Sequence, residues 1–144
     1  MPEAPETVCV ALVGHCGFDG SMLRKAVTQA AQRAGVQARL VDVGDQAGLE
    51  RGAPQLALVN RKLLGRFDAS EGGPLIERWL AGQSGSCRQA MLISNLPDAQ
   101  ASAEAVGALP GVGKSDLGSD AAIGRLAEAL RACVGSSANA GDAP

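Results

Sequence analysis

A continuous apolar run near the start of the chain, Val8–Val13 (VCVALV), limits the fold more than any other feature of the sequence. Its side chains do not alternate between apolar and polar, so we expect a strand that is covered on both faces. The glycine-containing loop Gly14–Gly20 follows, and Ser21 is then a candidate N-cap for a helix that ends at Gly35. This succession of strand, loop and helix is typical of a parallel sheet flanked by helices.

The same alternation continues along the chain. Further short apolar runs are expected as strands over 38–43, 56–60, 90–94 and 108–113. Helical patterns are expected briefly within 44–53, around 75–80, from 97 to about 106, and over 123–134. Right-handed crossovers between these strands predict an α/β fold, a three-layer, doubly wound, five-stranded parallel sheet. We expect a flexible N-terminus over residues 1–7, one domain over 8–134 and a disordered tail over 135–144.

The composition excludes several classes of protein. A chain of 144 residues fits one domain with a single core. Thirteen Lys and Arg residues against 15 Asp and Glu residues give a formal net charge of -2, which offers no basic field to a nucleic-acid backbone. Aromatic residues make up 2% of the chain, so there is no stacking platform for a single-stranded nucleic acid. We therefore expect no nucleic-acid partner.

Location and redox state are inferred from the chain start and the cysteines. The first residues are acidic and contain proline, unlike a secretory signal, and the apolar run 8–13 is too short to cross a bilayer. We expect a cytoplasmic protein without membrane insertion. The cysteines are scattered, without a C-x-x-C pair, so neither structural disulfides nor a zinc module is expected. They are Cys9, Cys16, Cys87 and Cys133.

Polar residues at the carboxyl ends of the expected strands are the candidate site residues, because such ends converge on one cleft in an open α/β sheet. They are His15, Cys16, Asn60, Ser94 and Lys114. Lys114 also belongs to a segment, Ala108–Ser115 (ALPGVGKS), that formally matches a relaxed phosphate-binding loop. The segment before it is helical in pattern, and few residues follow it, so we do not interpret this match as an NTPase.

The order of elements, together with the segment Ala90–Lys114, resembles the receiver domain of response regulators over residues 8–134. The resemblance implies a flavodoxin-like fold and a role in bacterial-type, two-component signalling. In that family an acidic pair after the first strand holds Mg²⁺, and an aspartate ending the third strand accepts a phosphoryl group. A Ser or Thr after the fourth strand and a lysine after the fifth contact the phosphoryl oxygens. Ser94 and Lys114 match these last two positions.

The residues that would perform the chemistry differ from the family pattern. Asn60 stands at the acceptor position, and a neutral amide is not a nucleophile toward phosphorus. His15 and Cys16 follow the first strand, and Asp19 comes later, so the oxygen ligands that Mg²⁺ prefers are missing from the expected place. These positions predict a degenerate phosphorylation site, with no catalytic residue, metal or cofactor. Read without the resemblance, Asn60 is a turn former, Ser94 a helix-entry hydroxyl and Lys114 a solvated side chain.

Cys16 is the candidate reactive thiol, because a helix N-terminus and a neighbouring histidine can both activate a cysteine. Plain loop packing is the alternative. Cys9 and Cys133 are expected to be buried and inert, and Cys87 to lie in an exposed loop.

A second candidate set could bind an anion. Arg61 and Lys62 directly follow Asn60, and with Lys114 they could form a positive pocket. A solvated loop is the alternative and the one we favour, because Asp68 and Glu71 offset the charge.

The sequence thus favours a stand-alone, non-enzymatic receiver-like module that acts by docking to a protein partner without aspartate phosphorylation; a second copy of the chain is one candidate partner. The alternatives are a small-molecule or anion sensor that uses the cleft of Asn60, Ser94 and Lys114, and a redox switch at Cys16. Docking is expected either at the last strand and helix, where Arg125, Glu128 and Arg131 are exposed, or at the long loop after Asn60.

Overall fold

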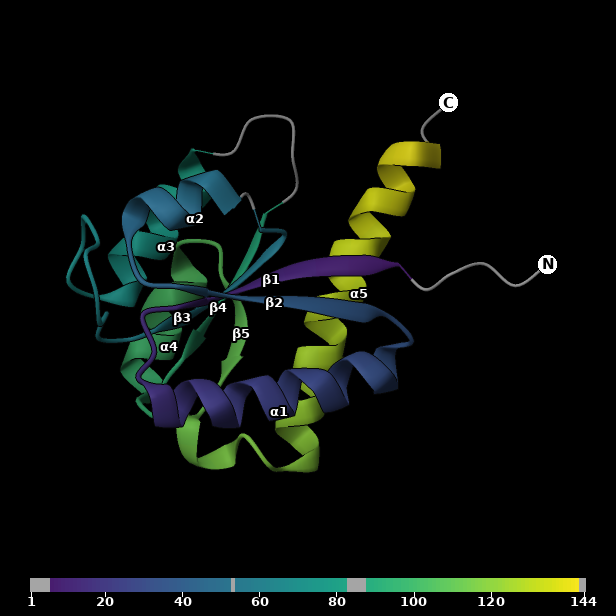
Figure 1. Ribbon diagram of the computed structural model, residues 1–144, viewed down its shortest axis with the longest axis horizontal. Helices are drawn as coiled ribbons and strands as arrows, with labels where there is room; N and C mark the ends of the chain where they lie inside the picture. Colours follow the sequence, from purple (N-terminus) through teal and green to yellow (C-terminus); the bar gives the residue numbers. More distant parts are fainter. Residues whose placement is uncertain (1–5, 53, 83–87, 143–144) are drawn as a thin grey trace.

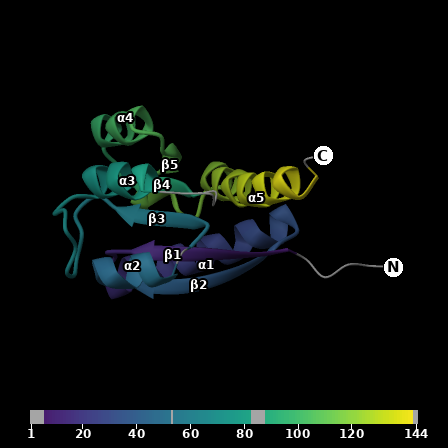
Figure 2. The same ribbon diagram turned by 90° about the horizontal axis from the view of Figure 1, so that it is seen from above.

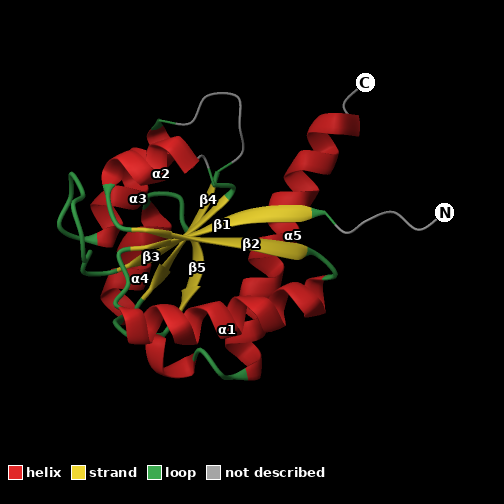
Figure 3. Cartoon of the chain, in the orientation of Figure 1, coloured by secondary structure: helices red, strands yellow, loops and turns green. Residues whose placement is uncertain are grey.

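The computed structural model describes residues 6–52, 54–82 and 88–142. Strands and helices alternate along the chain (Figures 1 and 3). The strands are β1 (Thr7–Val13), β2 (Gln37–Val43), β3 (Leu56–Asn60), β4 (Gln89–Ile93) and β5 (Leu109–Val112). The helices are α1 (Gly17–Ala34), α2 (Gln46–Gly52), α3 (Gly72–Ala81), α4 (Pro97–Ala105), α5 (Asp120–Asp142) and the short 3₁₀ helix η1 (Lys114–Asp116).

The five strands form one sheet in the order β2-β1-β3-β4-β5, and every neighbouring pair is parallel. β3 is buried along its whole length, as the apolar run Leu56–Val59 predicts for all of it except the polar Asn60. The fold class expected from the sequence is confirmed.

Two apolar clusters cover the two faces of the sheet. α1 and α5 pack beside each other on one face, where Leu23, Leu126 and Leu130 are fully buried against the strands. α2, α3 and α4 cover the other face, where Leu49, Ile76 and their neighbours form the second cluster. Seen from above, α3 and α4 lie next to each other, away from α1 (Figure 2). The sheet is therefore the middle layer of three.

Both ends of α1 are defined by local contacts. Gly35, with a φ of 74°, ends the helix in the left-handed conformation, as expected. The prediction that Ser21 is the N-cap is wrong. The cap and the helix start lie five residues earlier, because the Cys16 side chain serves as the cap and its Sγ accepts a hydrogen bond from the Asp19 N–H at 3.4 Å. The expected loop after β1 is therefore shorter than its glycines suggest.

The last helix is longer than the sequence predicts. Its apolar stripe ends near Val134, where the sequence analysis ends the domain, but the backbone of α5 remains helical to Asp142. No proline interrupts this segment before Pro144, so a helical backbone can continue. No helix in the described ranges is both long enough and apolar enough to cross a membrane.

Candidate functional site

The carboxyl ends of β3, β4 and β5 meet at one edge of the sheet, where they surround a hollow of about 300 Å³. The structure brings three of the predicted site residues together here, namely Asn60, Ser94 and Lys114. Arg61 and Lys62 line the same hollow. His15 and Cys16 instead line a separate hollow of about 240 Å³ between the start of α1 and the end of β2. The five predicted positions therefore divide between two sites.

Asn60 is held as an amide donor at the end of β3. Its side chain is buried, and Nδ2 donates to Gly14 O at 3.0 Å and to Lys62 O at 2.7 Å. Both partners are carbonyl oxygens, so the amide nitrogen must face them, and the orientation of the side chain is fixed. The bond to Lys62 O is local, as in a turn former, but the bond to Gly14 O ties β3 to the end of β1.

Ser94 organises the connection between β4 and α4. It is buried, and its Oγ accepts a hydrogen bond from Leu96 N–H at 3.1 Å. Gln100 reaches back from α4 and donates to Leu92 O at 2.8 Å and to Ser94 O at 3.1 Å. The hydroxyl oxygen thus has the helix-entry role that the sequence left open as an alternative.

Lys114 is paired with a residue that the sequence analysis placed outside the site. Its Nζ lies 3.0 Å from Asp19 Oδ2, and the two side chains are 32% and 28% exposed. The hydrogen bond from Lys114 lowers the pKa of Asp19, with smaller lowering contributions from the charges of Lys114 and His15 and from the Cys16 side chain. Because α1 begins at Gly17, Asp19 falls in its first turn and reaches the edge of the sheet; locating the Cys16 cap in the sequence could have indicated this.

The residues at this edge do not fit the Mg²⁺ ion that the receiver fold usually holds. The Asp19 carboxylate already accepts a bond from the Lys114 ammonium. Nowhere in the described residues do three His, Cys, Asp or Glu side chains cluster as a metal site would require. Mg²⁺ prefers several oxygen ligands, and His15 and Cys16 supply none from their side chains.

His15 is fixed to the backbone of β3 rather than to its neighbour Cys16. Its Nε2 lies 2.8 Å from Leu58 O, and its Nδ1 is buried with no hydrogen-bond partner. Burial lowers the pKa of His15, and the positive charge of Lys114 adds to this effect. His15 gives Cys16 no hydrogen bond, because the Leu58 carbonyl takes one ring nitrogen and the other has no partner. The reactivity of the Cys16 thiol stays a prediction.

The other cysteines differ in their surroundings. Cys133 is buried in the cluster formed by α1, α5 and the sheet, as predicted. Cys9 is only half-buried, so its prediction is wrong; it lies near the amino end of β1, outside both buried clusters. Cys87 lies outside the described residues.

The cationic residues of the proposed anion set are offset by acidic neighbours. Arg61 Nη1 lies 3.4 Å from Glu71 Oε1, and Lys114 is paired with Asp19. Lys62 is exposed. Glu71 offsets the charge of Arg61, as the sequence suggested. The second offsetting carboxylate is Asp19, which pairs with Lys114, and not the expected Asp68.

The segment between β3 and α3 lies across the ends of β1 and β2. Its Leu64 N–H donates to Gly14 O at 3.1 Å, and its Arg66 N–H donates to Gly44 O at 2.9 Å. Gly65, with a φ of 120°, permits this close approach, since a Cβ there would collide with Gly44 O. The long loop expected after Asn60 is thus fastened to the sheet.

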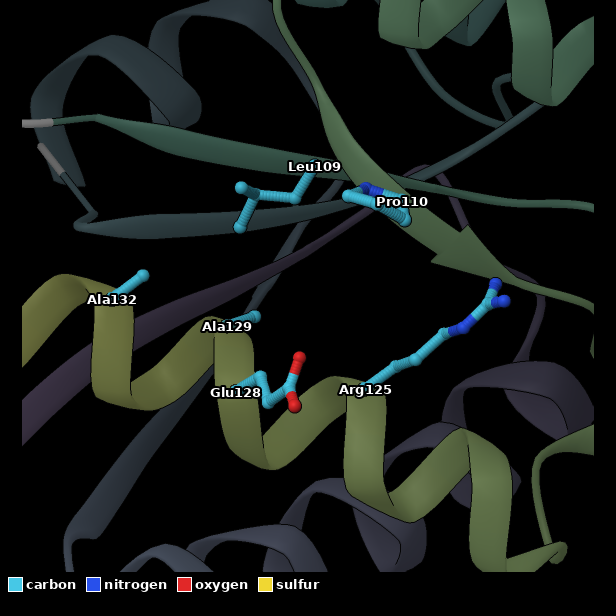
Figure 4. A pocket seen from close by; sticks show the side chains of 6 residues that line it. All are labelled: Leu109, Pro110, Arg125, Glu128, Ala129 and Ala132. Carbon is cyan, nitrogen blue, oxygen red and sulfur yellow. The ribbon is translucent and has the colours of Figure 1, made fainter.

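A third hollow, of about 240 Å³, lies between β5 and α5. Leu109 and Pro110 form one wall, Ala129 and Ala132 the other, and Arg125 and Glu128 project from α5 beside them (Figure 4). Arg125, Glu128 and Arg131 are all exposed residues, as predicted. Arg125 is not free, however, because its Nη1 donates to Gly111 O at 2.7 Å.

Comparison with known proteins identifies the fold. No protein-family model matches the chain, and no curated protein matches it significantly in sequence. Among solved structures, the signal receiver domain of the putative response regulator NarL from Mycobacterium tuberculosis is similar with a TM-score of 0.58 and 18% identity, over 91% of this chain and 98% of that one. Chemotaxis response regulator CheY4 of Vibrio cholerae is similar with a TM-score of 0.53 and 13% identity, over 90% of this chain and 99% of that one.

The response regulator RcsB of Salmonella typhimurium is similar with a TM-score of 0.61 and 14% identity; the match covers 93% of this chain and 62% of that longer one. At these identities the likeness establishes the fold and leaves the chemistry to be argued from the site residues. The chain has the fold of the receiver domains of response regulators.

Proposed function

We propose that this protein is a receiver-like signalling module that acts by docking to a protein partner, without transferring a phosphoryl group to the end of β3. The carrying observation is the orientation of Asn60, whose amide nitrogen donates to Gly14 O and Lys62 O. A carboxylate has no N–H to donate and would meet two carbonyl oxygens there. The backbone around this position therefore suits an amide and not a phosphoacceptor.

The pair of Lys114 and Asp19 supports the same proposal. In a phosphorylated receiver a lysine and an acidic pair serve a phosphoryl oxygen and a metal ion. Here one such lysine and one carboxylate satisfy each other at 3.0 Å. Neither charge is then held ready for an incoming phosphoryl group.

Incubation with a small phosphodonor and Mg²⁺, followed by intact-mass measurement, tests this proposal. We expect no phosphoryl adduct on the wild-type chain. Asn60→Asp is also expected to remain unmodified, because the metal ligands are still missing and the new carboxylate faces carbonyls. A phosphoryl adduct mapped to Asp19 or to any other carboxylate at this edge would contradict the proposal.

The docking surface that we propose is the hollow between β5 and α5 (Figure 4). Its walls are apolar, and its charged residues stand beside them, as in an interface with an apolar centre and a polar rim. Added-strand pairing at β5 is disfavoured, because Pro110 has no N–H and Arg125 covers Gly111 O. A partner would therefore insert side chains into the hollow.

Substitutions in the hollow test the docking. Ala132→Leu fills it, and Glu128→Lys changes the charge beside it. We expect the pair of changes to abolish capture of a partner from native extract, whereas Glu104→Lys, at an exposed position of α4, leaves capture unchanged. Capture that survives both changes would exclude this surface and move the interface to the segment of Arg61, Lys62 and Arg66. If the partner is a second copy of the chain, light scattering on the purified protein should show a dimer that the same two substitutions dissociate.

The two alternative functions receive less support. The hollow at Asn60 is lined by Arg61, Lys62 and Lys114, but two of these cations are already paired with carboxylates. Cys16 caps α1 and lacks a bond from His15. No observation favours either the anion sensor or the redox switch over docking.

A further inference from the structure

His15 is the only histidine of the chain, and its two ring nitrogens have very different surroundings. The Leu58 carbonyl, 2.8 Å from Nε2, can only accept a hydrogen bond, so Nε2 carries the proton of the neutral ring. Nδ1 then presents a lone pair, and this atom is buried without a partner. A second proton could enter the ring only at Nδ1, where the structure provides no acceptor.

Charged groups from three elements surround this ring. α1 contributes Asp19 and Arg24, β2 contributes Asp42, and Lys114 follows β5. They form two ion pairs: Arg24 with Asp42 at 2.6 Å and Lys114 with Asp19 at 3.0 Å. Each carboxylate near His15 is thus already engaged when the ring is neutral.

We propose that His15 is an acid-sensitive switch: when its Nδ1 takes a proton, Asp19 leaves Lys114 to accept the new N–H, and the segment after β5 is released. The proton comes from solvent, and the bond from Nε2–H to Leu58 O persists. Two hydrogen bonds change, and no covalent bond other than N–H forms. The proposal does not depend on protein docking.

Asp19 is the expected acceptor for two reasons. It lies in the first turn of α1, four residues after His15, and only its Oδ2 is bonded to Lys114. Asp42 makes the shorter ion pair, and its negative charge raises the pKa of His15 less than that of Asp19 does. Movement of Asp19 would leave the Lys114 ammonium beside Arg61 and Lys62, and the hollow at Asn60 would become more positive.

Stability should respond to pH in a defined direction. Burial lowers the pKa of His15 below its ordinary value of 6.5, which applies to the unfolded chain. Above pH 6.5 both states are neutral and the native state keeps its full stability. As the pH falls below 6.5, the unfolded chain takes up the proton first, so stability declines until the lower folded pKa is reached. His15→Gln should remove this decline.

Nuclear magnetic resonance can follow both partners of the switch directly. The single imidazole gives an unambiguous titration, and Lys114 is one of only three lysines. We expect the side-chain signals of Lys114 to shift with the same midpoint as His15 in the wild type, and to lose that transition in His15→Gln. The proposal is overturned if Lys114 stays constant through the His15 transition, or if it moves only when carboxylates titrate at lower pH.

Three further variants test the assignment of the acceptor even if His15→Gln fails to fold. Lys114→Met should raise the pKa of His15, because it removes a positive charge and frees Asp19. Asp19→Asn should lower this pKa and abolish the Lys114 transition. Asp42→Asn is the matched control and should lower the pKa less while preserving the transition. A larger effect from Asp42→Asn than from Asp19→Asn would refute the switch as proposed.

Discussion

Leu126 on α5 and Asn60 at the end of β3 are both buried, with exposed fractions of 1% and 5%, but different interactions hold them. Leu126 contacts an apolar cluster that accepts any side chain of suitable volume and shape. Asn60 depends on two named carbonyl oxygens, Gly14 O and Lys62 O. The helix-covered faces of the sheet are therefore specified by volume, whereas its carboxyl edge is specified by donors and acceptors.

The largest expected effect tests the volume side of this comparison. Leu126→Ala should lower the free energy of unfolding by about 2 to 5 kcal/mol, because it opens a cavity in the cluster between α5 and the sheet. Leu126→Met keeps most of the volume and should cost less than about 1.5 kcal/mol. Urea denaturation measures both. Equal losses for the two variants would show that shape, and not volume, controls this face.

Asn60→Ala tests the polar side of the comparison. Removing the amide takes one donor from Gly14 O, which keeps the Leu64 N–H, and one from Lys62 O, so each lost bond should cost about 0.5 to 1.5 kcal/mol. Asn60→Leu restores apolar volume but should not restore stability. If denaturation shows that Asn60→Leu is as stable as the wild type, then apolar volume alone stabilises the carboxyl edge of the sheet as it does the helix-covered faces. The proposed difference between the two regions would then be wrong.

This difference also explains what the sequence could predict. Apolar runs such as Leu56–Val59 and the stripe of α5 report volume and periodicity, so strand order along the chain, the helix faces and the buried Cys133 follow from the pattern. Asn60, Ser94 and Lys114 could be placed together because parallel strands end at one edge. The side chains that pair with them could not be predicted, since the pairing of Lys114 with Asp19 depends on the residue at which α1 starts.

The position of His15 illustrates the same limit. A ring nitrogen bonded to Leu58 O joins residues that lie far apart in the sequence, and no periodicity encodes such a bond. Cys16 as an N-cap was hidden for a related reason, because Ser, Thr, Asp and Asn are the usual caps and Ser21 is the more typical candidate.

Glycine-to-alanine substitutions are expected to have smaller effects, and the change in stability should have opposite signs on a helix-covered face and at the carboxyl edge of the sheet. Gly20 is helical and buried, yet a Cβ there would meet no neighbouring atom, so Gly20→Ala should stabilise the protein by about 0.4 to 1 kcal/mol. Gly72, at the start of α3, is the matched control: a Cβ there would collide with Asn60 O, so Gly72→Ala should destabilise it. Thermal unfolding of the two variants measures the signs, and a shared sign would contradict the open space beside Gly20.

The smallest effect is expected for Arg131→Glu, and its comparison with Arg125→Glu separates charges that stabilise the fold from charges that are available to a partner. Arg131 is exposed and reaches Arg33 O only at 3.3 Å, so its reversal should change the free energy of unfolding by less than about 0.5 kcal/mol. Arg125 donates to Gly111 O at 2.7 Å, and losing this charged donor should cost about 1 kcal/mol more.

Matched denaturation and partner-capture measurements on the two variants distinguish these roles. Loss of capture by Arg131→Glu at unchanged stability would assign its charge to the docking surface. Loss of capture by Arg125→Glu alone, together with lower stability, would instead show that the partner needs the covered edge of β5, since Arg125 fixes the Gly111 carbonyl there. Equal stability of both variants would mean that the bond to Gly111 O contributes little, and the protection of β5 would then depend on Pro110 alone.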